Sequence, residues 1–305
     1  MAIGHKILKV LLMTNIYTMN QRNFKSISPS AKSILLLKGY TNIPFARRTA
    51  ELLSEPDEFN PDFSIRDMTF WARILHFENR YLSIDKLFED LPVKNILELS
   101  SGYSFRSLAA ICKDDVHYID TDLQDVISLK KEFIEALTAE ENKTSGKLEL
   151  EPLNCLDEEQ FQEIAGHFTD GQIVIVNEGL LMYLNDGEKE KLCRIIHKIL
   201  EQRGGYWINA DIYLKNKQEK LDLKIDSKTK EFFLQHKIEE NKFNSFKDAE
   251  LFFKKMGFVI DKEAVVDRSE LSSMKYFLKS VSFKQLLKVS LAGKIQKTWR
   301  LRIDQ

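Results

Sequence analysis

The sequence predicts an α/β fold, with a doubly wound, mostly parallel seven-stranded sheet and an N-terminal helical cap. From Val93 onward, short apolar runs typical of strands alternate with segments of helical periodicity, whereas residues 1–92 contain no convincing strand. The apolar run Asn95–Leu99 stops at Ser100-Ser101-Gly102, and a new helical pattern begins near Phe105. A strand, a turn of small residues and a helix, in that order, are typical of the start of a doubly wound sheet.

The first third of the chain is predicted to form a helical cap or lid. Helical periodicity is present at Ile34–Leu37, at Ala50–Leu53 and over Thr69–Leu91, which is rich in aromatic residues, and Pro92 then ends the helical pattern. The apolar stretch Ile7–Met13 lacks a small-residue cleavage site, so we expect an amphipathic first helix and no signal peptide. The predicted domains are therefore a cap, residues 1–92, and an α/β core, residues 93–305.

Seven strands are predicted in the core, and the ligand of such a sheet lies beyond the carboxyl ends of its strands. The helices between them are clearest at Glu188–Glu201 and at Lys247–Met256, which Ser245 and Gly257 delimit. The strand candidates are Asn95–Leu99, His117–Asp120, Leu148–Leu153, Ile173–Asn177, Tyr206–Asp211, Phe258–Val266 and Gln296–Ile303.

Two charged segments are expected to face solvent. Residues 214–242 are dense in Lys, Glu and Asp, which predicts a solvated helical face or a mobile excursion. Residues 275–302 are basic and predict a helix and a final strand with charges outward, with attachment to a membrane surface as a lesser alternative.

Composition excludes several classes of protein. The 45 basic residues nearly cancel the 46 acidic ones, so no overall field attracts nucleic acid or an anionic membrane. The three cysteines, Cys112, Cys155 and Cys193, lie far apart and predict free thiols in a reducing compartment, with no metal pair. No apolar run approaches the roughly 18 residues of a membrane span. We expect a cytoplasmic protein without nucleic acid, bound metal or stable membrane insertion, and the sequence leaves the oligomeric state open.

Four polar groups stand at the ends of successive strands. Glu98–Ser104 forms the first turn, and Asp120-Thr121-Asp122 could accept hydrogen bonds from a ribose. Asn154-Cys155 could read an adenine edge, and Glu178-Gly179 is followed by Tyr183. Each has a structural alternative: the aspartates could only start a turn, and Asn154 could only cap a helix. Their joint occurrence favours a ligand site, since a carboxylate at Glu178 is costly at the edge of a core without a partner.

These residues resemble a known family. The chain looks like a class I S-adenosylmethionine-dependent methyltransferase, and within that class like the leucine carboxyl methyltransferase family, which includes bacterial O-methyltransferases of polyketide biosynthesis. The family motif E-L-G-x-G-x-D-x-R is similar to Glu98–Arg106, and E-x-D-x-P-x-V with a later lysine is similar to Asp120–Val126 with Lys130. The motif E-G-x-x-x-Y-L is matched fully by Glu178–Leu184. More loosely, Ser30-Ala31 with Lys38 resembles the lid segment, and Arg80 with Asp85 resembles R-x-x-x-x-D.

The resemblance, which covers residues 28 to about 211, implies a Rossmann-like methyltransferase core and S-adenosyl-L-methionine as cofactor. Arg80 would bind the methionine carboxylate, and Glu178 or the carbonyls of the first turn would bind its ammonium. Asp120, with Asp122 as second candidate, would hold the ribose, and Asn154 with the Cys155 backbone would meet the adenine. The implied cofactor site comprises Arg80, Glu98, Ser100, Gly102, Asp120, Asp122, Asn154, Cys155, Glu178 and Gly179, and Tyr183 would position the acceptor. Ser100 and Ser104 depart from the family's glycine and aspartate, and serine fits at Ser100 if its φ is negative.

The predicted reaction is methyl transfer to oxygen, on a carboxylate or hydroxyl of a small molecule or peptide chosen by the cap. A carboxylate is ionised at pH 7 and needs no base, whereas a phenol, with a pKa of about 10, benefits from one. No histidine stands in the four groups, although His76 of the cap could reach them, so a carboxyl acceptor is favoured. One alternative is a degenerate member that binds without turnover. A nicotinamide-dependent oxidoreductase is disfavoured, because residues 98–103 lack the G-x-G-x-x-G spacing.

Overall fold

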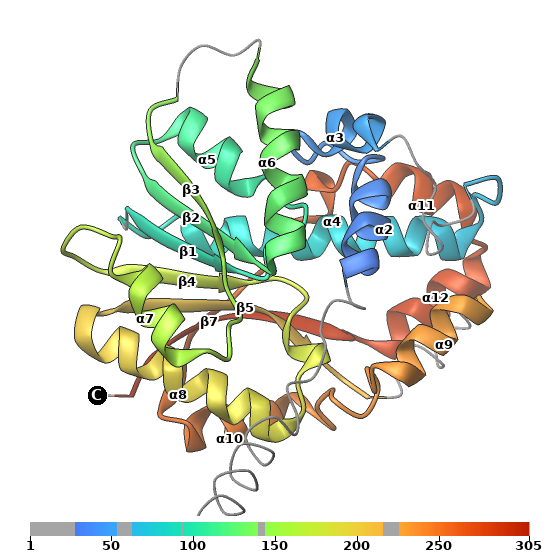
Figure 1. The fold of residues 1–305 in the computed structure, drawn as a ribbon. Helices are drawn as coiled ribbons and strands as arrows, with labels where there is room; N and C mark the ends of the chain where they lie inside the picture. The colour runs from blue at the N-terminus through green and yellow to red at the C-terminus, as the bar shows by residue number, and fades with distance from the viewer. Residues whose placement is uncertain (1–27, 54–62, 93, 140–143, 216–225, 305) are drawn as a thin grey trace, which may run out of the picture.

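A single mixed sheet of seven strands forms the centre of the protein (Figure 1). The computed structural model describes residues 28–53, 63–92, 94–139, 144–215 and 226–304, and the predicted first helix at Ile7–Met13 lies outside them. The strand order is β3-β2-β1-β4-β5-β7-β6. The strands are β1 (Asn95–Leu99), β2 (His117–Asp122), β3 (Lys147–Pro152), β4 (Ile173–Asn177), β5 (Gly205–Tyr213), β6 (Phe258–Glu263) and β7 (Gln296–Ile303).

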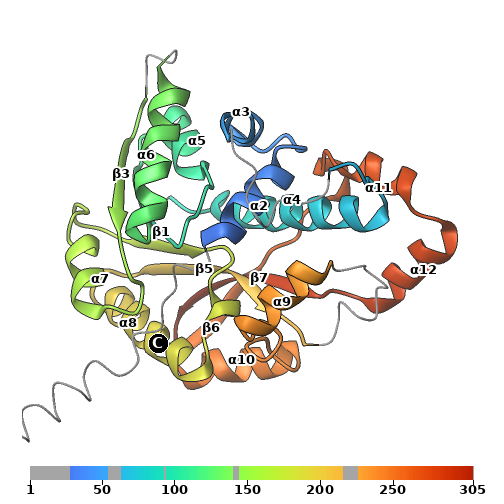
Figure 2. The same ribbon diagram turned by 45° about the vertical axis from the view of Figure 1, so that its right-hand side comes forward.

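The sheet is parallel from β3 to β5, and β7 runs antiparallel to both β5 and β6. The prediction of a mostly parallel, seven-stranded sheet is confirmed, but the reversed last strand was not predicted. Its cause is the path of the chain. The chain leaves β6 at the edge where the parallel strands end, forms two helices there, and returns from the same edge as β7 (Figure 2).

Three strands have the predicted bounds, and the other four shift by a few residues. The largest differences are in β5, which continues past Asp211 to Tyr213, and in β6, which stops at Glu263 instead of Val266. Both follow from pairing with β7. After a register shift, Ile212 and Tyr213 pair with Lys297 and Gln296, and on the other side the pairing ends at Glu263 with Trp299.

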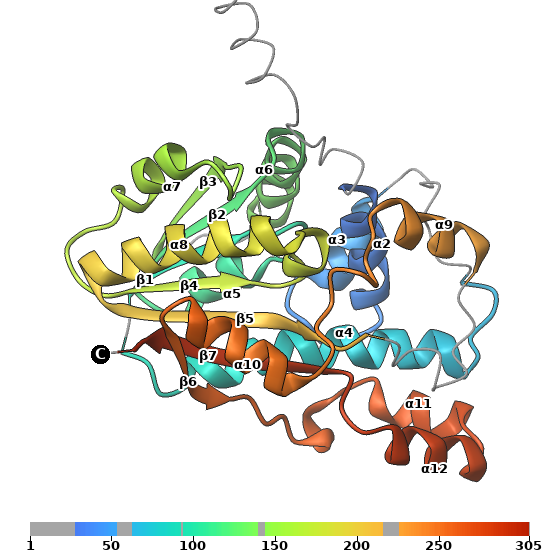
Figure 3. The ribbon, with the colours of Figure 1, turned by 90° about the horizontal axis from the view of Figure 1, so that it is seen from below.

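Helices cover both faces of the sheet (Figure 3). Those on one face are α4, α5 and α6, and those on the other are α7, α8 and α10. The helix bounds are α2 (Ser28–Lys38), α3 (Ala46–Leu52), α4 (Met68–Phe88), α5 (Arg106–Lys113), α6 (Gln124–Thr138), α7 (Glu158–Ala165), α8 (Asp186–Arg203), α9 (Ser227–Gln235), α10 (Phe246–Lys255), α11 (Met274–Ser280) and α12 (Phe283–Ala292).

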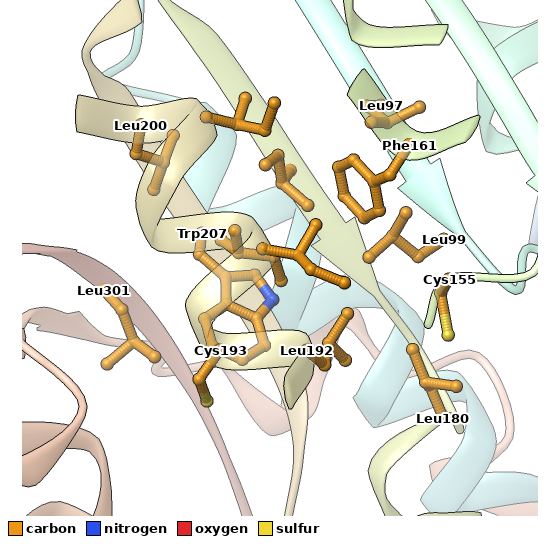
Figure 4. Close-up of a cluster of buried hydrophobic side chains, with 14 of the residues drawn as sticks. Leu97, Leu99, Cys155, Phe161, Leu180, Leu192, Cys193, Leu200, Trp207 and Leu301 are labelled. Atoms are coloured by element: carbon orange, nitrogen blue, oxygen red, sulfur yellow. The ribbon is translucent and has the colours of Figure 1, made fainter. Parts of the chain in front are cut away.

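Alternation along the strands divides the core into two layers. Leu97 and Leu99 pack with Phe161 of α7 and Leu192 of α8, as Figure 4 shows, whereas their neighbour Ile96 packs in the layer under α4 and α5. Each fully buried side chain of this size contributes about 1.5–3 kcal/mol. The two layers together fix the strand ends on which the candidate site is built.

The N-terminal helices are part of this core. Asp67 caps α4 by accepting a hydrogen bond from the Phe70 amide (3.0 Å), and Tyr81 and Ile84 of α4 share a hydrophobic cluster with Val176 of β4. The described part of the predicted cap therefore packs directly on the sheet. A domain boundary at residue 92, and a substrate-selecting role for the first 92 residues, stay predictions.

Both charged segments contain buried residues that were expected in solvent. Of the segment 214–242, residues 216–225 lie outside the described residues. In the rest, α9 has the predicted solvated face, but Phe232 and Ile238 pack against Tyr183 on its inner side. In β7, Arg300 is buried and its Nε lies 2.5 Å from Asp261 Oδ2, because a strand between two neighbours has little solvent beside it. Charges on β7 are therefore not all outward. None of the described helices has the length and hydropathy that crossing a membrane would require.

Candidate functional site

A cavity of about 810 Å³ lies over the carboxyl ends of β1, β2 and β4. Its floor is made by the turns after these strands, and its walls by α2, α4, α9, α11 and α12. All the residues predicted for the site line this cavity except Glu98 and Asp120. Those that line it are Arg80, Ser100, Gly102, Asp122, Asn154, Cys155, Glu178, Gly179 and Tyr183.

The turn after β1 is tightly folded. Ser100 has φ 50° and Gly102 φ 52°, so the condition under which serine fits easily at this position, a negative φ, is not met. The Gly102 amide donates to Asp122 Oδ2 (2.8 Å), and a Cβ at Gly102 would lie 3.3 Å from Ala31 of α2. This left-handed backbone conformation is costly for serine, and Ser100 adopts it because the chain turns sharply from β1 into α5.

Glu98 and Asp120 lie beneath the cavity, in the layer between the sheet and α5. Asp120 pairs with Lys130 (2.8 Å) and accepts a hydrogen bond from Ser107, while Glu98 accepts one from Tyr118. Burial and the nearby Asp120 raise the pKa of Glu98 to about 8. Neither side chain lines the cavity, so a direct contact of Glu98 or Asp120 with a ligand stays a prediction. Asp122, the second candidate for the ribose, is the carboxylate of β2 that reaches the cavity.

Glu178 is the centre of a buried ion cluster. Its carboxylate lies 2.6 Å from Lys38 Nζ, 3.1 Å from Arg80 Nη2 and 3.2 Å from Arg106 Nη2. Burial alone would raise the pKa of Glu178, but Lys38, Arg80 and Arg106 outweigh it and lower the pKa to about 2. The same burial lowers the pKa of Lys38 despite the attraction of Glu178. Charges buried this deeply are stable only as a group.

The cluster shows what the two residues of the R-x-x-x-x-D pattern do in the structure. Arg80 and Asp85 both lie on α4, where Arg80 reaches Glu178 and Asp85 pairs with Arg106 at the start of α5. The Arg106 guanidinium also lies 3.8 Å from the centre of the Tyr81 ring. Three segments that are far apart in the sequence are thus held together by one network.

A second buried network fixes the turn at Glu178-Gly179. Asp211, near the end of β5, accepts hydrogen bonds from the amides of Gly179 (2.6 Å), Leu180 (2.7 Å) and Leu181 (3.1 Å). Asn177 donates to the same carboxylate at 2.6 Å. Sequence reasoning missed Asp211 as a site residue, although it ends a predicted strand just as Asp120 does. The same strand-end criterion, applied to Tyr206–Asp211, would have found it.

A chain of hydrogen bonds runs from Arg80 across the cavity wall. Arg80 Nη1 donates to the Tyr213 hydroxyl (3.0 Å), which lies 2.7 Å from His76 Nε2. Burial and the positive charge of Arg80 lower the pKa of His76 to about 3, and burial raises the pKa of Tyr213 to about 12. Both side chains are therefore neutral at pH 7. The expectation that His76 could reach the site holds in the structure, since it lines the cavity.

The remaining predicted residues make local contacts as well. Asn154 Oδ1 accepts a hydrogen bond from the Leu156 amide (3.1 Å), so its side chain forms a turn at the cavity wall. Burial raises the pKa of the Cys155 thiol to about 12, which keeps it uncharged. The Tyr183 hydroxyl lies 3.1 Å from Ser30 Oγ of α2 and its ring packs near Phe232 of α9. Tyr183 thus joins the two sides of the cavity.

The far end of the cavity is apolar with a few cations. Its apolar lining includes Phe77 of α4 and Phe277 of α11, and its cations include Arg73 and Lys242. Outside the cavity, Glu149, Glu151 and His167 bring potential ligand atoms within 4.8 Å of one another. Since Glu149 already bonds to Lys147, His117 and His167, we interpret that group as an ion network and assign no metal to it.

Comparison with known proteins gives a partial sequence match. No family model matches the chain. Leucine carboxyl methyltransferase 1 from Kluyveromyces lactis is 25% identical over 136 residues, and the match spans 38% of this chain and only 40% of the length of that relative. Among solved structures, magnesium protoporphyrin IX methyltransferase from Synechocystis PCC 6803 has 9% identity and a TM-score of 0.47, covering 88% of this chain and 99% of that one. Mitomycin 7-O-methyltransferase has 10% identity and a TM-score of 0.43, covering 77% and 57%.

TM-scores below 0.5 are too low to assign a family or a role to the chain. The similarity to a known family therefore rests on the sequence match and the motifs. The curated match is to a protein of the family that the motifs Glu98–Arg106 and Glu178–Leu184 indicated. The chain is thus similar to a class I methyltransferase of the leucine carboxyl type.

Proposed function

We propose that the protein is an S-adenosylmethionine-dependent O-methyltransferase whose acceptor is a carboxylate of a small molecule or peptide. The observation that carries this proposal is the buried cluster of Glu178 with three cations at the floor of the cavity. A ligand that carries both an ammonium and a carboxylate can enter such a cluster without leaving a buried charge unpaired. The amino-acid end of the cofactor has both groups.

The residues of the cavity fit the rest of the cofactor. Gly102 and Gly179, both with positive φ, stand on either side of the cluster and carry no Cβ. A Cβ at Gly102 would approach Ala31, and a Cβ at Gly179 would lie 3.4 Å from Arg80. Asp122 faces the cavity and would accept hydrogen bonds from the ribose hydroxyls. Asn154 and Cys155 would border the adenine.

The cofactor supplies an electrophilic methyl group, and the task left to the chain is to hold an acceptor oxygen in line with it. A carboxylate needs no proton removed at pH 7, which suits a wall whose histidine, His76, is neutral and bonded to Tyr213. Of the cations that line the cavity, Arg73 is attracted to Asp226 and Lys242 pairs with Glu239, so an anionic acceptor would compete with these carboxylates for them. Tyr183 would help to position it, and the apolar lining would pack against its carbon skeleton.

Calorimetric titration with S-adenosylhomocysteine tests the cofactor site. Asp122→Asn should weaken binding about tenfold or more, because a charged hydrogen bond contributes about 1.5–3 kcal/mol. The matched control is Asp120→Asn, two residues earlier on the same strand, which should lower stability more than affinity. No binding by the unchanged protein would contradict the proposal, and equal effects of the two substitutions would mean that the ribose lies elsewhere.

Turnover is tested separately, with S-adenosylmethionine that carries a labelled methyl group and a panel of carboxylic acids and phenols. Transfer to acids would support the proposed acceptor. Transfer only to phenols would contradict the carboxylate, and cofactor binding without transfer to any acceptor would favour the alternative of a binding protein.

A further inference from the structure

The last part of the chain has an unusual charge distribution. From Leu271 to Ile303 there is no Asp or Glu, although the whole chain has 45 basic and 46 acidic residues. The segment contains eight basic residues, Lys275, Lys279, Lys284, Lys288, Lys294, Lys297, Arg300 and Arg302. Four of the eight, Lys275, Lys279, Lys284 and Lys288, lie on α11 and α12, whereas Lys294 and Lys297 pair with Glu263 and Arg300 pairs with Asp90 and Asp261.

Helix α12 carries large apolar side chains in solvent. Phe283 is 82% exposed, Leu287 50% and Leu291 79%, and their spacing of four residues places them on one stripe of the helix. No residue of α12 is buried. A helix of ten residues is marginal in water unless one face packs against something, and among the residues that the structure describes this stripe stays largely uncovered.

The position of α12 connects this stripe to the cavity. Figures 1 and 2 show α12 at the edge of the molecule beside α11, away from the sheet. Leu286 and Val289 of α12 and Met274 of α11 line the far end of the cavity, whereas Phe283 and Leu291 are exposed. The two helices therefore lie between the cavity and the outside.

We propose that the segment formed by α11 and α12 docks on an anionic lipid surface. Lysines next to such a surface are attracted to the anionic headgroups, and apolar residues between them insert below the headgroups. A nucleic acid would match the charge but would leave Phe283, Leu287 and Leu291 in water. A second copy of the chain would bring two faces of the same sign together, which is unfavourable. Lipid is the partner that satisfies both the charge and the apolar stripe.

Co-sedimentation of the full chain with lipid vesicles tests this docking independently of any methyl transfer. We expect binding to phosphatidylcholine vesicles that contain phosphatidylglycerol, little binding to phosphatidylcholine alone, and weaker binding at high salt. The double variant F283S/L291S and the double variant K279E/K284E should each lower the partition coefficient about tenfold or more, which corresponds to about 1.4 kcal/mol. All four positions are exposed, so circular dichroism and the melting temperature should match those of the unchanged protein.

The matched controls lie on other exposed helices. Leu234→Ser on α9, where the side chain is 79% exposed, and Lys247→Glu on α10 should change partitioning less than twofold. The proposal is overturned if the protein does not sediment with anionic vesicles, or if the controls reduce binding as much as the α11 and α12 variants. It is also overturned if F283S/L291S converts a dimer into a monomer in light scattering, since a second copy would then cover the stripe.

Discussion

Replacing Glu178 by glutamine removes one negative charge from the centre of the ion cluster while keeping nearly the same shape. The side chain is only 4% exposed, and its partners Lys38, Arg80 and Arg106 are equally buried. Without the carboxylate, the cations repel one another with little water to screen them. We expect Glu178→Gln both to destabilise the fold and to weaken the binding of S-adenosylhomocysteine.

The size of the stability effect follows from the pKa of Glu178. Its ordinary value is 4.5 and its value in the folded protein is about 2, a difference that corresponds to roughly 3 kcal/mol. Because the folded pKa is the lower one, this contribution is fully present above pH 4.5 and is lost as the pH falls towards 2. At pH 7 the variant should therefore be less stable by about 3 kcal/mol, and at pH 3 by only about 1 kcal/mol.

Urea unfolding at the two pH values measures this difference. The matched control is Glu263→Gln, since Glu263 also lies close to cations, Lys294 (2.8 Å) and Lys297 (2.7 Å), but is 30% exposed. Partly exposed ion pairs contribute little, so we expect a change below about 1 kcal/mol there.

Two outcomes would refute the reasoning. A loss at pH 7 no larger than that of the Glu263→Gln control would mean that the cations do not depend on Glu178. A loss that stays constant between pH 7 and pH 3 would mean that the effect of Glu178 comes from its shape and hydrogen bonds, not from its charge.

Two further substitutions test the turns that border the cluster. Ser100→Gly should raise the free energy of unfolding by up to about 1 kcal/mol in urea, because Ser100 has φ 50°, and a loss of stability would indicate that its hydroxyl makes a compensating contact. Asp211→Asn should lower the free energy of unfolding by about 2–4 kcal/mol, because an amide cannot accept all the hydrogen bonds that Asp211 receives at Gly179 and its neighbours. It should also weaken S-adenosylhomocysteine binding in calorimetry, and unchanged affinity would show that the turn at Gly179 holds without it.

The sequence predicted the strands well because apolar runs bounded by turn residues are local features. The bounds of β1, β4 and β7 were correct, and those of β5 and β6 differed where pairing with β7 decides the end of the strand. The direction of a strand could not be predicted, because a short alternating run such as Gln296–Ile303 has the same sequence pattern in a parallel and in an antiparallel sheet. Only the position of the helices before it determines that β7 is reversed.

The candidate site was predictable where one residue type at a strand end was sufficient, as for Asp122 and Glu178. It was not predictable where distant segments meet. Asp120 is covered by Ser107 and Lys130, which approach from α5 and α6. The residues next to Asp120 in the sequence do not reveal these contacts. Likewise, the charged composition of residues 214–242 hid the apolar contact of Phe232 with Tyr183, because a single buried residue barely changes the average of a polar segment.

The charges of the cluster also bear on the acceptor. Lys38, Arg80 and Arg106 face three carboxylates: Glu178 and Asp85 pair with them directly, and the buried Asp211 attracts Arg80, so the cluster has no excess positive charge. The amino-acid end of the proposed cofactor is neutral overall, and its sulfonium would add one positive charge to this balance. An ionised acceptor bound nearby would compensate the sulfonium charge, whereas a neutral phenol would not, and for this reason we propose a carboxylate as the acceptor.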